Sequence, residues 1–287
     1  MMCRSWCAPA LAACLVGVPA AVRSEPPKSL RVGLSGGLVQ DTPEALVRAA
    51  LPPMQVLLEK QTGFKGECAV VPGFEELLKQ LAEGKVQVGI FPGHEFAWAR
   101  AKDAQLRPLL IAVNGQRQLF VHVLVRADNP ALALDDLKEG AVAVPRCSKS
   151  HCRLFVARLA FLDGRTTAPA SGEDALDELV EGVVQAAVVD TATLECFQRR
   201  KPGRFARLKE VHKSCPFPAP VLAYRAGSLA EADLRRIVDG LARTHQTLAG
   251  KQVLTLWRLT AFEPVPDNHD QALAEIARLY PPPGGGR

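Results

Sequence analysis

Two copies of one short pattern limit the fold of this chain more than any other feature. Residues 81–91 (LAEGKVQVGIF) and 179–189 (LVEGVVQAAVV) are identical at five of eleven positions. In each copy an amphipathic helix, expected at 74–83 and 174–181, stops at a glycine and leads into an almost wholly apolar strand. Strands that are apolar on both faces are typical of parallel sheets covered by helices on both sides. The repeat therefore predicts two α/β lobes of similar architecture.

Length and composition agree with this interpretation. The 287 residues are 48% hydrophobic and 23% charged, which excludes a fibrous or largely disordered chain. A chain of this length is long enough for two domains of ordinary size. The formal net charge of +5 is small and dispersed, so no nucleic-acid partner is expected.

The hydrophobic pattern extends each copy into a longer series of strands and helices. A helix is expected from Pro53 to Thr62, and another from Ser148 to about Leu162. Ser228 and Glu231 have the spacing of a capping box. Two further helices are expected at 228–249 and 268–280. Strands are expected at 30–34, 67–71, 107–113, 118–126, 141–145, 183–190, 205–211 and 221–225.

The order of these elements predicts how the lobes are divided. Residues 25–120 together with 222–287 are expected to form one lobe, and residues 121–221 the other. Two crossover segments, near Arg126 and Val221, would act as the hinge. The carboxyl ends of the strands would then face a ligand cleft between the lobes.

The first 24 residues have the composition of an export signal. A short basic start precedes an apolar run at 8–21, and small residues follow at 22–24. This run is too short for a membrane span. Residues 11–14 (LAAC) also resemble a bacterial lipobox, in which Cys14 would carry a lipid. We expect an exported, periplasmic or extracytoplasmic protein, free or tethered at Cys14.

Cysteine usage leaves the redox state open. Five cysteines follow the expected signal segment, so at least one is unpaired. Cys147 and Cys152 are nearest in sequence, but a disulfide between them is geometrically uncertain, and buried thiols are the alternative. The five are Cys68, Cys147, Cys152, Cys196 and Cys215.

Polar residues follow the predicted strands of the second lobe. Ser148 and Ser150 are candidate N-caps for the following helix, and with Lys149 they would form a small anion site. The alternative is a capped helix with a solvated lysine. Asp190 ends the repeated strand, where it would either face the cleft or cap the next helix.

The corresponding positions of the first lobe carry a second polar set. Gly93 would let backbone approach a ligand, and the polar side chains of His94 and Glu95 would face the same ligand. The alternative for His94 and Glu95 is that they only cap the start of a helix at the surface. Ser35 and Gly36 follow the first strand and would add N–H donors, or form only a flexible turn.

In this order the motifs resemble the phosphate, phosphite and phosphonate substrate-binding proteins of ABC importers. The resemblance rests on GKVQVGIFPG (84–93), VRAD (125–128), DDLKEG (135–140), Ser-x-Ser at 148–150 and SCPFP (214–218), and spans about residues 29–280. It implies a bilobal periplasmic-binding-protein fold of the second type that closes on a small anionic ligand. It also implies an ABC permease as partner. We expect a monomer without catalytic activity, cofactor or metal.

Position by position, the resemblance implies particular ligand-binding residues. The family has a Ser-Thr-Ser helix start that holds the oxyanion, and the matching positions here are Ser148, Lys149 and Ser150. Its Gly-Pro-rich loop matches residues 92–96, and its acidic residue at the end of the repeated strand matches Asp190. Lys149 replaces the threonine and should favour a dianion. His151 replaces a glycine, and the loop near Phe96 lacks a tyrosine. Glu95 or Asp190 would hold the ammonium of an aminophosphonate, or would repel a bare phosphate.

Three other functions fit parts of the sequence. Cys147 or Cys152 with His151 would make a thiol enzyme, although no third orienting residue is evident. The same three residues would supply only part of a zinc site. A binding protein that signals to a membrane partner would need the same closure on a small anion, so the sequence does not separate sensing from transport.

Overall fold

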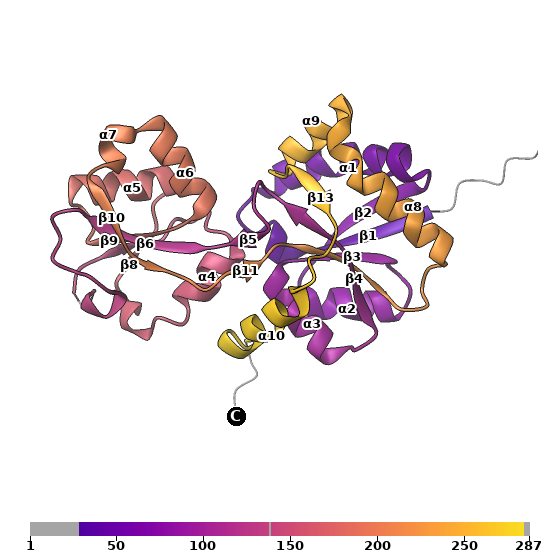
Figure 1. Ribbon diagram of the computed structural model, residues 1–287, viewed down its shortest axis with the longest axis horizontal. Helices are drawn as coiled ribbons and strands as arrows, with labels where there is room; N and C mark the ends of the chain where they lie inside the picture. Colours follow the sequence, from indigo (N-terminus) through magenta and orange to yellow (C-terminus); the bar gives the residue numbers. More distant parts are fainter. Residues whose placement is uncertain (1–28, 138, 284–287) are drawn as a thin grey trace, which may run out of the picture.

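The computed structural model describes residues 29–137 and 139–283. It consists of two α/β lobes joined by a narrow connection (Figure 1). The predicted two-lobe α/β architecture is thereby confirmed. The expected export segment 1–24, including Cys14, lies outside the described residues. No helix in the described ranges combines the length and apolar character needed to cross a membrane.

The first lobe is built on a six-stranded sheet with the order β13-β4-β12-β3-β1-β2. β1 runs parallel to β2 and β3, whereas β12 runs antiparallel to β3 and β4. The strands are β1 (Ser29–Ser35), β2 (Lys65–Val71), β3 (Val88–Phe91), β4 (Leu106–Val113), β12 (Val221–Arg225) and β13 (Ala261–Glu263).

Helices cover both faces of this sheet. One core contains Leu30, Met54 and Ile237 and packs under α1, α8 and α9, and the other contains Leu77, Phe91 and Phe96 and packs under α2 and α3. The helices are α1 (Glu44–Thr62), α2 (Phe74–Ala82), α3 (Gly93–Lys102), α8 (Glu231–Ala242) and α9 (Leu248–Leu256), with short 3₁₀ turns η1 (Gly36–Leu38) and η4 (Thr244–Gln246).

The second lobe has a five-stranded sheet with the order β10-β6-β9-β7-β8. Its strands are β6 (Val121–Arg126), β7 (Val142–Ala143), β8 (Thr166–Thr167), β9 (Ala186–Asp190) and β10 (Leu208–Lys213). Its helices are α4 (Ser150–Val156), α5 (Gly172–Glu181), α6 (Thr191–Arg200) and α7 (Pro202–Phe205), with 3₁₀ turns η2 (Leu134–Asp136) and η3 (Ala160–Leu162).

The two sheets share one connectivity. The order β4-β12-β3-β1-β2 in the first lobe corresponds to β10-β6-β9-β7-β8 in the second. The two copies of the sequence repeat therefore occupy equivalent places, as α2 with β3 and as α5 with β9. Gly84 and Gly182 follow these helices with φ of 69° and 77°, which confirms the predicted glycine stops.

A two-stranded ribbon joins the lobes, and we call it the hinge. β5 (Gln118–Leu119) pairs antiparallel with β11 (Phe217–Pro218). Arg126, where a crossover was expected, instead ends β6 within the second-lobe sheet. α10 (His269–Leu279) lies beside this ribbon (Figure 1) and contributes Leu273 to a core of the first lobe and Ile276 to a core of the second. The C-terminal helix thus packs against both lobes.

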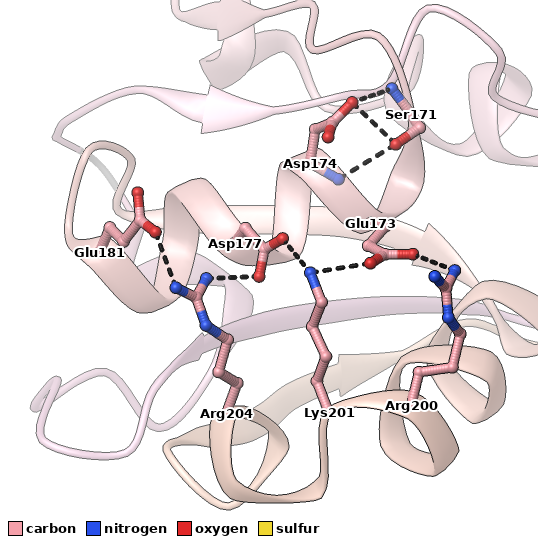
Figure 2. A network of polar contacts seen from close by, with 8 residues as sticks. All are labelled: Ser171, Glu173, Asp174, Asp177, Glu181, Arg200, Lys201 and Arg204. Atoms are coloured by element: carbon pink, nitrogen blue, oxygen red, sulfur yellow. Dashed lines mark hydrogen bonds and ion pairs between the residues drawn. The ribbon is translucent and has the colours of Figure 1, made fainter.

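A ladder of opposite charges fixes the outer helices of the second lobe (Figure 2). Asp177 on α5 accepts 2.5 Å hydrogen bonds from Lys201 and Arg204, which precede and occupy α7. Glu173 and Glu181 flank Asp177 and pair with Arg200, Lys201 and Arg204. Ser171 begins α5 with a capping box completed by Asp174. The ladder ties α5 to the end of α6 and to α7, so these helices form one rigid layer.

The predicted limits of two helices are wrong. α1 begins at Glu44 and passes through Pro52 and Pro53, because buried residues on both sides of the prolines hold its inner face to the core. α4 ends at Val156, where the chain turns into η3 and buries Leu162.

The predicted helix to Ala249 is divided in two. α8 stops at Ala242, and the Thr247 hydroxyl accepts the Gly250 N–H and starts α9. Ser228 and Glu231 form no capping box, since Ala230 occupies the N-cap position of α8.

Candidate functional site

The second lobe brings Lys149 and Asp190 together. Lys149 Nζ lies 3.6 Å from Asp190 Oδ2, and Asp190 is 8% exposed. Asp190 Oδ1 accepts a 2.8 Å hydrogen bond from the Thr193 N–H, so this carboxylate both caps α6 and pairs with Lys149. Burial raises the pKa of Asp190, but Lys149 and Thr193 outweigh burial and hold the pKa below its usual value. Asp190 is therefore a buried carboxylate with its own cation.

The predicted serine caps are not formed. Lys149 occupies the N-cap position of α4, and no side chain accepts a hydrogen bond there. Ser148 is 7% exposed and its carbonyl accepts a 2.9 Å hydrogen bond from Arg153. Ser150 is the first residue of α4. The backbone turn after Pro145, closed by the Ser148 N–H, explains why the helix starts at Ser150 and not at Ser148.

The first lobe brings Ser35 and Glu95 together. The Ser35 hydroxyl, fully buried at the end of β1, donates a hydrogen bond to Glu95 Oε2 on α3. Glu95 Oε1 lies against Gly37, where a Cβ atom would come within 2.1 Å of it. Burial raises the pKa of the Glu95 carboxyl, and the Ser35 hydrogen bond acts in the opposite direction. Glu95 is thus a half-buried acid held by one hydroxyl, and no side-chain hydrogen bond caps the start of α3.

Gly93 and Gly36 serve close backbone packing. A Cβ atom on Gly93 would lie 2.2 Å from the Pro218 carbonyl oxygen of the hinge strand β11. On Gly36 it would lie 2.7 Å from the Pro72 carbonyl oxygen. The close approach at Gly93 is therefore to the hinge strand, and the expected approach of backbone to a ligand stays a prediction.

Two buried histidines flank the hinge. The rings of His94 from α3 and His151 from α4 lie 6.4 and 5.6 Å from the Phe217 ring in β11. Burial lowers the pKa of His94 to about 3, and that of His151 to about 4. His151 Nε2 is buried without a hydrogen-bond partner. His94 precedes Glu95 and His151 follows Ser150, so each polar set is adjacent in sequence to a histidine that packs on Phe217.

A second polar chain was not anticipated from the sequence. His122 on β6 contacts Glu210 Oε2 through Nδ1 and lies 2.9 Å from Thr191 Oγ1 through Nε2. Thr191 is the first residue of α6, directly after Asp190. The signal available in the sequence was weak: a histidine within a buried strand, whose partners come from two other elements.

One cavity lies away from these polar sets. It has a volume of about 520 Å³ and none of the nine predicted site residues lines it. Its walls come from the hinge segments and the region of α10, including Gln116, Arg117, Phe120, Pro216 and His269. Gln116 also donates a 2.9 Å hydrogen bond to Glu195 of the second lobe, so the lobes are in contact beside this cavity.

The thiol and metal alternatives gain no support. Burial raises the pKa of Cys152 well above its usual value, which opposes a reactive thiolate. Within the ranges that the structure describes, all five cysteines are unpaired, and no three His, Cys, Asp or Glu side chains gather as metal ligands would.

Comparison with known proteins gives one family and many structures of the same fold. The family of ABC transporter phosphonate periplasmic substrate-binding proteins matches residues 37–270. No curated protein matches the sequence.

Three solved structures illustrate the fold similarity. A Xanthomonas citri protein bound to ATP has 16% identity and a TM-score of 0.61 over 88% of this chain and 96% of that chain. PhnD1 from Prochlorococcus marinus in complex with methylphosphonate has 14% identity and a TM-score of 0.60 over 88% and 98%. A binding protein component of an ABC phosphonate transporter from Pseudomonas aeruginosa has 14% identity and a TM-score of 0.57 over 89% and 87%.

Proposed function

Because this chain belongs to the family of periplasmic substrate-binding proteins of ABC phosphonate transporters, we propose that it binds a small phosphorus oxyanion between its two lobes. Phosphate, phosphite and phosphonate are the candidate ligands. The family serves ABC transporters and binds substrate without transforming it, and its location is extracytoplasmic. The corresponding partner of this chain is an ABC permease.

The proposed site consists of the two polar sets whose neighbouring histidines pack on Phe217. Lys149, with the backbone and hydroxyls of Ser148 and Ser150, supplies positive charge and donors from the second lobe. Ser35 and Glu95, with the backbone at Gly36 and Gly93, supply the first-lobe half. His94 stays neutral near pH 7 and packs the hinge, and Asp190 holds Lys149.

One observation carries this proposal. His94 and His151, direct neighbours of the two polar sets, contact the same hinge ring from opposite lobes. Rotation about a two-stranded hinge at that ring changes the separation of the two sets, as ligand closure requires. Both halves belong to one chain, so we propose that a monomer suffices. Export by residues 1–24, with or without a lipid on Cys14, belongs to the same proposal.

Thermal melting tests the proposal. The chain from Glu25 onward is melted with phosphate, phosphite, methylphosphonate, aminoethylphosphonate, sulfate and methanesulfonate, because a ligand that binds only the folded state raises Tm. We expect a selective increase with at least one phosphorus oxyanion. If Tm is unchanged with all phosphorus oxyanions, the ligand assignment fails although the fold stands.

A further inference from the structure

The charges of the proposed site do not suit a fully ionised oxyanion. Lys149 is 3.6 Å from Asp190, so its positive charge is already balanced within the protein. Asp190 keeps its charge near pH 7, since its pKa lies below the usual value. The histidines nearest the two sets, His94 and His151, have pKa values of about 3 and 4 and add no positive charge there. An incoming dianion therefore meets no uncompensated cation among these residues.

Glu95 adds an acid to this balanced site. Its Oε2 accepts a hydrogen bond from the Ser35 hydroxyl, and its Oε1 lies against Gly37. Burial raises the pKa of this carboxyl, so binding a proton is easier for Glu95 than for an exposed glutamate. An ionised Glu95 repels an anion, whereas a proton placed between Oε1 and a ligand oxygen turns repulsion into a charge-assisted hydrogen bond.

Among the titratable groups near the proposed site, Glu95 is the one expected to share a proton with the ligand. Ser35 of β1 and Gly37 of η1 contact it directly and carry no charge. The titratable groups of the first lobe near this site include His94, which precedes Glu95 on α3, and Asp41, which follows η1. Those of the second lobe include Lys149 and His151 at the start of α4 and Asp190 at the end of β9. Lys149 and Asp190 balance each other, and Asp41 lies 3.7 Å from Arg258.

We propose that Glu95 selects ligands that still carry an acidic P–OH, because one proton is shared between Glu95 and the bound oxyanion. This inference rests on the proposed function and deepens it, because it names the residue that would favour phosphorus oxyanions, which titrate near neutral pH, over sulfonates. Phosphonates, phosphite and phosphate bring such a proton. A sulfonate brings none and is a weak base, so it is repelled by ionised Glu95.

Isothermal titration calorimetry with methylphosphonate and methanesulfonate tests the inference on the chain from Glu25 onward. Wild type should bind methylphosphonate at least about tenfold more tightly than methanesulfonate at about pH 6. Its affinity for methylphosphonate should fall as pH rises from about 6 to about 9, because the ligand and Glu95 both lose the shared proton. A site that prefers the dianion would show the opposite slope.

Glu95→Gln identifies the residue responsible. The amide cannot be ionised and can donate to a fully ionised oxygen, so the variant should bind methanesulfonate more tightly than wild type and show a flatter pH profile for methylphosphonate. Glu44→Gln is the matched control, because Glu44 is an exposed residue of α1 that pairs with Arg48 on the same helix. The control should behave as wild type.

The outcomes separate this inference from the proposed function. Equal wild-type affinities for the two ligands, or affinity for methylphosphonate that rises with pH, would overturn the role of the shared proton while leaving oxyanion binding intact. A folded Glu95→Gln that keeps the wild-type selectivity and slope would overturn the assignment to Glu95. Absence of methylphosphonate binding at every pH would overturn this inference, whereas the proposed function fails only if phosphate and phosphite do not bind either. If Glu95→Gln does not fold, the wild-type pH profile alone decides.

Discussion

Asp190 Oδ2 lies 3.6 Å from Lys149 Nζ, although the two residues come from the end of β9 and the start of α4. β7 lies directly beside β9 in the sheet, so the loop after β7 must pass the carboxyl end of β9. The pair therefore follows from strand order. It places a balanced pair of charges at the edge of the second lobe.

Substitution of Gly93 tests the packing between α3 and the hinge. Gly93→Ala should destabilise the protein by roughly 1–3 kcal/mol, because the new Cβ would overlap the Pro218 carbonyl oxygen. Urea denaturation measures the change. Gly203→Ala is the control, since a Cβ there meets no atom within 4 Å. Equal midpoints for both variants would show that the hinge strand moves aside without cost.

Acid should weaken the fold through its buried histidines. The pKa of His151 falls from 6.5 in the unfolded chain to about 4 in the folded one. Between these values the unfolded chain binds more protons, so stability is greatest above about pH 6.5 and decreases as pH falls toward 4. The free energy of unfolding should drop by about 2 kcal/mol from this residue between pH 7 and pH 5.

Replacement of the histidine ring tests that origin. His151→Phe removes the titrating group and the unpartnered Nε2, so the decrease in Tm between pH 7 and pH 5 should become smaller. His245→Phe at an exposed position should retain the wild-type dependence. An unchanged pH dependence in His151→Phe would mean that other groups cause the acid loss.

Thiol labelling tests the rejection of a cysteine nucleophile. Cys68 and Cys152 are buried, and burial raises the pKa of Cys68 to about 12. In native protein these two thiols should not react with a disulfide reagent within minutes at about pH 8, whereas denaturant should expose all five. Mass spectrometry of labelled peptides identifies the sites. Rapid labelling of native Cys152 would revive the thiol-enzyme hypothesis.

The sequence predicted the lobes better than the limits of individual helices. The repeat, the glycine stops and the apolar strands all act locally, and each reappears at its predicted position in β3 and β9. The continuation of α1 through Pro52 and Pro53 depends on packing against a distant sheet, which no local pattern encodes.

The candidate site was predicted in its parts but not in its contacts. The positions of the predicted strand ends were enough to select Ser35, Glu95, Lys149 and Asp190 as candidates. This works because the carboxyl ends of neighbouring parallel strands lie at the same edge of a sheet. The contacts themselves could not be predicted. The Ser35–Glu95 hydrogen bond and the packing of His94 and His151 on Phe217 each join residues at least 60 positions apart, and the spacing of residues in the sequence does not reveal such contacts.

Calorimetric titration of Lys149→Ala with the phosphorus oxyanion that raises Tm most tests the central claim directly. If Lys149 contacts a desolvated oxyanion, its removal should weaken affinity by tenfold or more, about 1.4 kcal/mol, and also leave Asp190 as an uncompensated charge beside the ligand. Lys251→Ala on α9, outside the proposed site, should bind as wild type. Unchanged affinity in a folded Lys149→Ala would contradict the account and remove Lys149 from the site.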